Sequence, residues 1–205
     1  MITDKKVQWF IKPVLFLVCL LPFFTLVAGA INQSLGVNPV ETMTHETGDW
    51  TLRFLLITLL VTPLRKITGA SWLIKLRRML GLFAFFYAVL HFITYIWFDQ
   101  YFDLMEIAKD IPKRPFITVG FIAFVLLIPL ALTSTNKMMK RLKRNWAKLH
   151  KLVYVIAVLG CLHFLWLVKA DTFEPLVYFL ILLALLAFRA YQDRFNNISP
   201  QRTQR

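Results

Sequence analysis

Six long stretches of mostly apolar residues constrain the fold of this chain more than any other feature. They cover residues 9–31, 48–64, 79–98, 116–135, 147–168 and 173–190. Each is close to the about 20 residues that a helix needs to cross a bilayer. Because backbone polar groups in lipid must be satisfied internally, the sequence predicts an all-α fold, a polytopic membrane bundle of six transmembrane helices in one domain over residues 1–205. The second stretch is expected to end at Pro63 and the fourth to kink at Pro129, since proline interrupts helices.

The composition excludes an ordinary soluble domain and disfavours nucleic-acid binding. The chain is 58% hydrophobic and only 17% charged, whereas soluble domains are about 45–50% apolar and about 25% charged. The net charge of +13 lies in short runs between the apolar stretches. That distribution is typical of charges that orient membrane helices rather than of a nucleic-acid surface.

The basic residues predict that both termini lie in the cytoplasm. Of the 24 lysines and arginines, 19 fall in the N-terminal segment, the 64–78 and 136–151 connections and the C-terminal tail. The other connections are dominated by acidic residues, and the positive-inside rule places them outside. As an alternative for the first stretch, Ala28-Gly29-Ala30 matches a signal-peptide cleavage pattern; the other five spans keep their orientation either way.

Two histidines lie inside predicted spans at the same depth. His91 is about 10 Å and His163 about 8 Å from the predicted outer surface, at 1.5 Å of helical rise per residue. Ionisable side chains in a membrane are costly and mark functional sites by default. Neutral imidazole is a common haem ligand, so the pair predicts axial ligands for one haem iron. The alternative is that each histidine only hydrogen-bonds across helices.

Small residues accompany both histidines. Gly81, Ala84 and Ala88 precede His91 on one helical face, and Gly160 stands three residues before His163. We interpret them as a groove in which a flat macrocycle can lie against the backbone. Close packing between membrane helices is the alternative explanation.

The inner half of the bundle is less complete as a cofactor site. His150 lies 13 residues before His163, and the corresponding positions before His91 carry Arg77 and Arg78, which are not ordinary haem ligands. His150 is therefore a candidate for a second haem or another inner cofactor. Arg53, Arg77 and Arg78 are candidate contacts for a propionate or another anion. Alternatively, Arg53 extends its charged end to the lipid headgroups, and Arg77 and Arg78 only set the orientation of the helices in the membrane. His45 is expected to be solvated.

No catalytic residues are predicted in this chain. Cys19 and Cys161 fall in apolar spans and are expected to be small buried hydrophobes. GxGxxG, P-loop and HExxH motifs are absent from the sequence. The connections are too short for a dinucleotide-binding domain, so any electron donor or catalytic partner must be a separate molecule.

Two segments resemble the ferric-reductase-like transmembrane superfamily. The run Arg77–Leu82 followed by Tyr87–His91 resembles its third span, and Trp146–Tyr154 followed by His163 resembles its fifth. Over essentially its whole length the chain is similar to superfamily members that serve as haem-binding membrane subunits of bacterial periplasmic methionine sulfoxide reductase systems.

The resemblance implies an electron-transfer subunit of the bacterial inner membrane, with b-type haem and also FMN. Electrons would come from the quinone pool or a cytosolic flavin reductase and pass to a periplasmic molybdopterin enzyme that repairs oxidised proteins. The resemblance also implies that His91 and His163 are the ligands of an outer haem and that His150 is a ligand on the inner side. The inner third-span ligand has no histidine counterpart, which leaves one or two haems open. The acidic 99–110 region is either a docking edge for the partner or a solvated loop.

Two rival functions remain at the level of sequence. One is a self-contained ferric reductase or superoxide-producing haem protein that needs no partner. The other is a haem-free transporter that uses its histidines as proton carriers.

Overall fold

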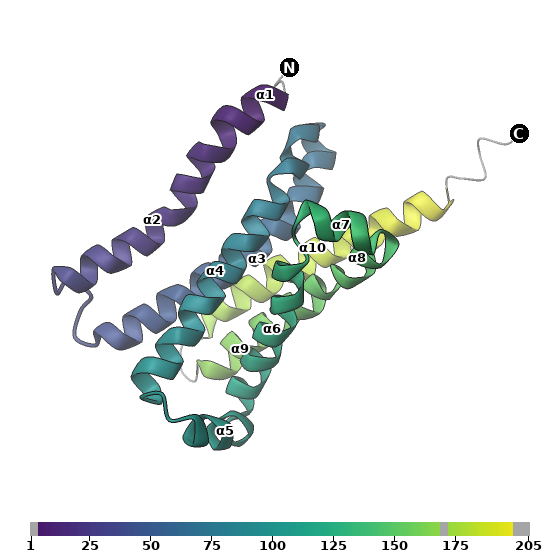
Figure 1. Cartoon of the computed structure of the whole chain (residues 1–205). Coiled ribbons are helices and arrows are strands. Elements are labelled where there is room, and N and C mark those ends of the chain that lie inside the picture. Colours follow the sequence, from purple (N-terminus) through teal and green to yellow (C-terminus); the bar gives the residue numbers. More distant parts are fainter. Residues whose placement is uncertain (1–3, 169–171, 199–205) are drawn as a thin grey trace, which may run out of the picture.

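The computed structural model describes residues 4–168 and 172–198, and every regular element in them is a helix (Figure 1). In chain order the α-helices are α1 (Asp4–Lys6), α2 (Lys12–Ile31), α3 (Pro39–Thr68), α4 (Arg77–Thr94), α5 (Leu104–Lys113), α6 (Pro115–Leu132), α7 (Asn136–Leu142), α8 (Arg144–Leu149), α9 (Leu152–Leu167) and α10 (Phe173–Ile198). Two π-helical turns, Val7–Ile11 and Tyr95–Asp99, join α1 to α2 and extend α4, and a 3₁₀ turn over Ser71–Lys75 precedes α4. The predicted all-α fold is confirmed for these residues.

Five of the six predicted spans correspond to described helices that are long and apolar enough to cross a membrane. These helical segments are Val7–Ile31, Arg77–Asp99, Pro115–Leu132, Arg144–Leu167 and Phe173–Gln192. The predicted span 48–64 lies within α3, which is not among them. Asp49 and Arg53 lower its hydropathy. The crossing of α3 and the orientation of the bundle therefore stay predictions.

Helix α3 is longer at both ends than the sequence predicted. It begins at Pro39, where the side chain of Asn38 accepts a hydrogen bond from the backbone N–H of Glu41. Pro63 lies inside the helix, so the expected end at this proline is wrong. The helix continues to Gly69, whose φ of 70° closes it in the left-handed conformation that glycine adopts without strain.

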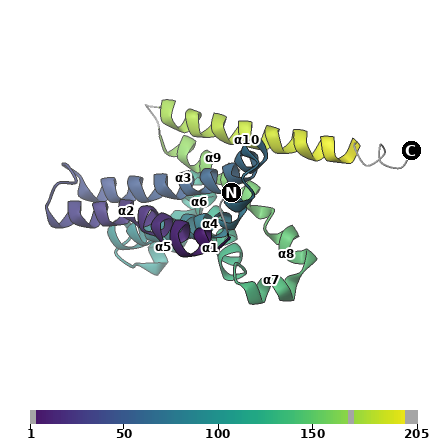
Figure 2. The same ribbon diagram turned by 90° about the horizontal axis from the view of Figure 1, so that it is seen from above.

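Two connections between the predicted spans are partly helical. Asp103 caps α5 by accepting hydrogen bonds from the backbone N–H groups of Met105 and Glu106, and Thr135 caps α7 through the N–H of Met138. Helix α5 closes the end of the bundle between α4 and α6 (Figure 1). Helices α7 and α8 project sideways from the other helices (Figure 2).

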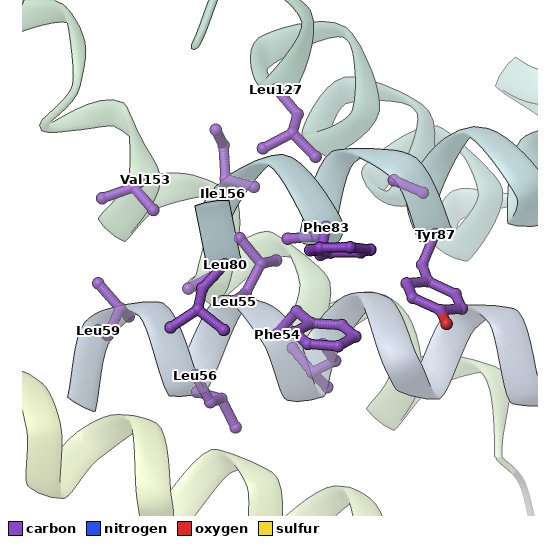
Figure 3. Close-up of a cluster of buried hydrophobic side chains, with 14 of the residues drawn as sticks. Phe54, Leu55, Leu56, Leu59, Leu80, Phe83, Tyr87, Leu127, Val153 and Ile156 are labelled. Atoms are coloured by element: carbon purple, nitrogen blue, oxygen red, sulfur yellow. The ribbon is translucent and has the colours of Figure 1, made fainter. Parts of the chain in front are cut away.

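The core lies where α3 packs against α4, and α6 contacts α4 while α9 contacts α3. Figure 3 shows Phe54 and Phe83 facing each other near Tyr87 in this cluster. The rings of Phe54 and Tyr87 stack with centroids 5.4 Å apart, and those of Phe54 and Phe83 with centroids 5.7 Å apart. Cys19 and Cys161 are buried free thiols, as expected for small hydrophobes.

Tyr87 ties α2 to this core at a proline. Its hydroxyl donates to the carbonyl of Cys19 at 2.8 Å and accepts from the N–H of Phe23 at 3.1 Å. These two backbone groups would bond each other in an uninterrupted helix, so the hydroxyl is inserted into the ladder of α2 beside Pro22. The tyrosine side chain is fully buried.

Large apolar side chains cover the outside of the bundle. Leu17 on α2 and Leu180 on α10 are 62% and 64% exposed, and many others resemble them. Such extensive apolar exposure is unfavourable in water and suits a surface that faces lipid.

Candidate functional site

His91 on α4 is oriented by the backbone of α3. Its Nδ1 lies 2.9 Å from the carbonyl oxygen of Thr44. Because a carbonyl oxygen only accepts hydrogen bonds, Nδ1 carries the hydrogen and donates it. The other ring nitrogen, Nε2, then holds a lone pair, which is the form of imidazole that binds metals.

His163 on α9 has the same arrangement with a different helix. Its Nδ1 donates to the carbonyl oxygen of Phe116 on α6 at 2.7 Å. Metal-binding histidines usually donate their second ring nitrogen to such an acceptor, which fixes the tautomer and the ring orientation. Both histidines are thus held as Nε2 ligands by carbonyls from neighbouring helices.

The two rings face each other across the bundle. Their centroids are 6.0 Å apart and their planes are inclined by 75°. Two metal–nitrogen bonds of about 2 Å, with about 1 Å from each nitrogen to its ring centre, span a similar distance. The depth match predicted from the sequence therefore brings the two side chains together.

Two ligands alone do not make a site for a bare metal ion. Among residues 4–168 and 172–198, no group of three or more His, Cys, Asp or Glu side chains is arranged to hold one. Zinc sites in proteins need three or four protein ligands. A haem iron needs only axial ligands from the protein, so the pair fits haem better than a free ion.

Each histidine packs against a glycine of a neighbouring helix. A methyl group on Gly120 of α6 would lie 2.7 Å from Nδ1 of His163, which is a steric clash. A methyl group on Gly48 of α3 would lie 3.1 Å from Nδ1 of His91. The two glycines therefore allow the close approach that the hydrogen bonds to the backbone carbonyls require.

A cavity of about 460 Å³ opens beside the pair, between α3, α4, α6 and α9. Its deep part is apolar and includes Leu55, Leu127 and Ile156. Its other end, at the side predicted to face outward, carries charged and polar groups that include His45, Asp99 and Arg114. An apolar slot with one polar end suits an amphiphilic planar ligand, as haem is with its two propionates.

Arg114 is held at the polar end of the cavity by a carboxylate clamp. Asp110 accepts hydrogen bonds from Tyr95 at 2.9 Å, from Gln100 at 3.1 Å and from Nε of Arg114 at 2.7 Å. The Arg114 guanidinium holds the pKa of the Asp110 carboxyl below its usual range, and the carboxylate in turn raises the pKa of Arg114. The clamp joins α5 and the start of α6 to the end of the α4 segment.

The predicted groove residues divide into two pairs. Ala88 and Gly160 line the cavity together with the histidines. Gly81 and Ala84 do not line it: a methyl group on Gly81 would meet Thr58 of α3 at 3.7 Å, and Ala84 is fully buried. The alternative explanation, close helix packing, fits these two.

Arg53 faces away from the cavity toward α10. Its Nε donates to the Tyr178 hydroxyl at 2.7 Å, its Nη2 lies 3.3 Å from Asp49, and the guanidinium stacks over the Trp50 ring at 4.9 Å. It is not among the residues that line the cavity.

His150 is far from the outer pair and has polar partners of its own. Its Nε2 is 3.1 Å from the hydroxyl of Thr133, and its ring stacks on Trp146 with centroids 4.0 Å apart. Arg77 is close enough to affect it electrostatically, and Arg78 donates to Asn136. The structure does not bring a second histidine to this group within its described residues.

His45 lies on α3 rather than in an irregular loop. Its side chain is 46% exposed, is 4.0 Å from Glu41, and stands at the polar end of the cavity.

Three residues of the site were missed in the sequence. Gly48 and Gly120 each lie in a predicted span, and their role becomes visible only from the histidine that each one faces. Arg114 directly precedes Pro115, the first residue of α6, and was counted only as an outer charge. A search for glycines and cations near the predicted depth of the histidines could have selected all three.

The comparisons with known proteins agree on one family. The sequence model of a family described as "Ferric reductase like transmembrane component" matches residues 47–161, which include Gly48, His91, Gly120 and His150. A protein of Herminiimonas arsenicoxydans called "Protein-methionine-sulfoxide reductase heme-binding subunit MsrQ" is 56% identical, over 91% of this chain and 88% of its own length. Proteins with the same name from Azospira oryzae and Polaromonas naphthalenivorans are 50% and 55% identical, over 94% and 88% of this chain and 84% of each relative. No solved structure matches the chain.

Proposed function

The chain belongs to the ferric-reductase-like transmembrane family, in its MsrQ group, and we propose that it is a haem-binding electron-transfer subunit of a methionine sulfoxide reductase system. The observation that carries the proposal is the pair His91 and His163. Both donate Nδ1 to backbone carbonyls and leave Nε2 available, with ring centroids 6.0 Å apart.

We infer that one haem b occupies the cavity beside this pair. His91 and His163 would hold the iron, Ala88 and Gly160 would lie against the macrocycle, and Arg114 at the polar end would neutralise a propionate. When bound, haem supplies one-electron exchange between ferric and ferrous iron. The residues of the chain fix the two imidazoles, exclude water from the deep end and place positive charge at the mouth.

The second haem and FMN are secondary parts of the proposal. His150 is the remaining histidine within a predicted span, which makes it the candidate ligand for a second haem. Its Nε2 contacts Thr133 and one face of its ring contacts Trp146. FMN is included in the proposal because the chain resembles the superfamily.

The proposed direction of transfer runs from the cytoplasmic side to the periplasm. The positive-inside pattern places both termini in the cytoplasm and the polar mouth of the cavity on the outer face of the inner membrane. The acceptor would be a periplasmic molybdopterin methionine sulfoxide reductase, MsrP, which docks there. The donor would be the quinone pool or a cytosolic flavin reductase.

A reconstituted relay tests this function. The purified chain is reduced under anaerobic conditions, first with a quinol and separately with a flavin reductase and its nicotinamide substrate. MsrP and methionine sulfoxide are then added while the haem absorbance is followed. With MsrP in catalytic amount, we expect complete reoxidation only when both are added. With His163→Ala, which should lack the haem, we expect no reduction of methionine sulfoxide.

Other outcomes would identify the rival functions. Reduction of ferric chelates or dioxygen at the same rate without MsrP would contradict the relay and favour a self-contained reductase. A correctly folded chain that is colourless after expression with excess haem would favour the haem-free transporter.

A further inference from the structure

A second cavity lies at the end of the bundle opposite to the paired histidines. Its volume is about 170 Å³, and it is enclosed by the last turns of α3, the first turn of α9 and the second half of α10. These turns belong to the side that the basic residues place in the cytoplasm. The polar side chains at its wall are Thr62, Lys66, Tyr154, Arg189 and Gln192.

The hydroxyl of Tyr154 is buried beside this cavity. The guanidinium of Arg77 is close to it, but no hydrogen bond of ordinary geometry joins the hydroxyl to another described residue. A buried hydroxyl without a partner is unfavourable, and such groups in native proteins usually mark a ligand, an ion or a water. A tyrosine hydroxyl both donates and accepts, so it can bond an oxyanion.

Positive charge surrounds this hydroxyl. The guanidinium of Arg189 stacks over the Tyr154 ring, 4.8 Å from its centroid. Arg77 of α4 interacts electrostatically with both residues. Lys66 donates to Oε1 of Gln192, which leaves the amide nitrogen of Gln192 as a further donor. Guanidinium, ammonium, amide and hydroxyl donors from three helices form a set that suits phosphate oxygens.

The rest of the cavity wall is apolar and consists of Leu59, Pro63, Leu185, Leu186 and Phe188. A ligand with a phosphate and an attached apolar part would satisfy both kinds of wall. The volume is several times that of a water molecule, about 30 Å³, which leaves room for a phosphate group and the first atoms of its substituent.

We propose that this cavity binds a phosphate group, with Tyr154, Arg189 and Lys66 as donors. The same chemistry occurs in two sources, the head group of an anionic phospholipid and free phosphate in the cytoplasm. The apolar wall favours the phospholipid. The site is independent of the haem cavity, which lies at the other end of the bundle.

The test is ligand-induced thermal stabilisation of the full chain in a neutral detergent after extensive delipidation. Phosphatidylglycerol, diacylglycerol and inorganic phosphate are added separately, and the unfolding midpoint is followed by intrinsic fluorescence. The variants are Tyr154→Phe and Arg189→Gln, and Arg194→Gln is the matched control because Arg194 is an exposed α10 arginine that does not line the cavity. Each increment is measured against the midpoint of the same variant without ligand, so a less stable variant remains informative.

We expect phosphatidylglycerol to raise the midpoint of the wild type and of Arg194→Gln by several degrees, and diacylglycerol to leave it unchanged. The increment should fall by more than half in both cavity variants. An increment with inorganic phosphate as well would identify free phosphate as a source, and an increment with the lipid alone would identify the head group. Equal increments in the wild type and both cavity variants, or no increment with either phosphate compound, would overturn the proposal.

Discussion

The rings of His91 and His163 lie with their centroids 6.0 Å apart, although the two residues come from different helices and are 72 positions apart in the chain. Each ring is turned toward the other by a backbone carbonyl behind it, that of Thr44 for His91 and that of Phe116 for His163. The position of these carbonyls is therefore as important for the site as the histidines themselves.

Gly120→Ala is expected to weaken haem binding. The added methyl group would lie 2.7 Å from Nδ1 of His163 and would displace the ring from the carbonyl of Phe116. Overpacking costs about 1–3 kcal/mol, which corresponds to roughly a five- to hundredfold weaker affinity. Haem titration of the purified variant measures this. Gly81→Ala is the control, because its methyl group would meet Thr58 at an ordinary 3.7 Å, and equal losses in the two variants would refute the packing argument.

Gly48→Ala should give a smaller effect of the same kind. The nearest atoms of His91 would be 3.1 Å from the new methyl group, so a shift of a few tenths of an ångström suffices. The expected order of haem affinity is therefore Gly81→Ala, then Gly48→Ala, then Gly120→Ala as the weakest. A reversed order for the last two would show that His91 is held more rigidly than His163.

Tyr87→Phe is expected to destabilise the bundle by about 1–2 kcal/mol, since a buried hydroxyl that bridges Cys19 and Phe23 is removed. The unfolding midpoint in detergent should fall, and haem content should stay near that of the wild type. Tyr191→Phe serves as control because Tyr191 is 65% exposed on α10. An unchanged unfolding midpoint in Tyr87→Phe would mean that α2 forms its own backbone hydrogen bonds beside Pro22 without a loss of stability.

Arg114→Gln should lower the midpoint potential of the bound haem. A positive charge at the mouth of the cavity favours the ferrous state, so its removal favours the ferric state. Arg53→Gln is the comparison, because Arg53 faces Tyr178 and Asp49 instead, and its replacement should affect stability more than potential. Equal potentials for Arg114→Gln and the wild type would remove Arg114 from the proposed propionate contact.

Asp110 should make stability depend on pH in the acid range. Its pKa in the folded chain is lowered by the hydrogen bond from Arg114, so its contribution is complete above the unfolded value of about 4 and is lost as the pH falls through the folded value. Asp110→Asn should have a lower midpoint at neutral pH and a weaker dependence on pH below about 4. Asp103→Asn, which keeps a capping side chain on α5, should retain the dependence of the wild type, and a flat wild-type profile would contradict the clamp.

The sequence was sufficient for the features that depend on local composition. Apolar length located five helices that are long and apolar enough to cross a membrane. Helical rise placed His91 and His163 at one depth, and the structure brings their ring centroids within 6.0 Å of each other. Proline was a weaker guide to where a helix ends, because α3 continues past Pro63 while it packs against α4.

The remaining features depend on how helices face each other, which spacing within one helix does not specify. Gly48 and Gly120 acquire their role only from histidines on other helices. The sequence favoured Arg53 as a propionate contact and gave Arg114 no role beyond its charge. The rotation of α3 turns Arg53 toward α10, while Arg114 at the start of α6 lines the cavity. Gly81 and Ala84 share a helical face with His91 in sequence, yet they lie too deep along α4 to reach the cavity.

If His91 and His163 hold one haem, the amount of haem per chain in purified protein is the most direct measurement of it. Wild type, His91→Ala, His163→Ala and His150→Ala are expressed with excess haem and quantified as the pyridine haemochrome beside the protein concentration. We expect about one b-type haem in the wild type and in His150→Ala, and less than about a tenth of that in the other two. Unchanged haem content in both His91→Ala and His163→Ala, with loss in His150→Ala, would contradict it.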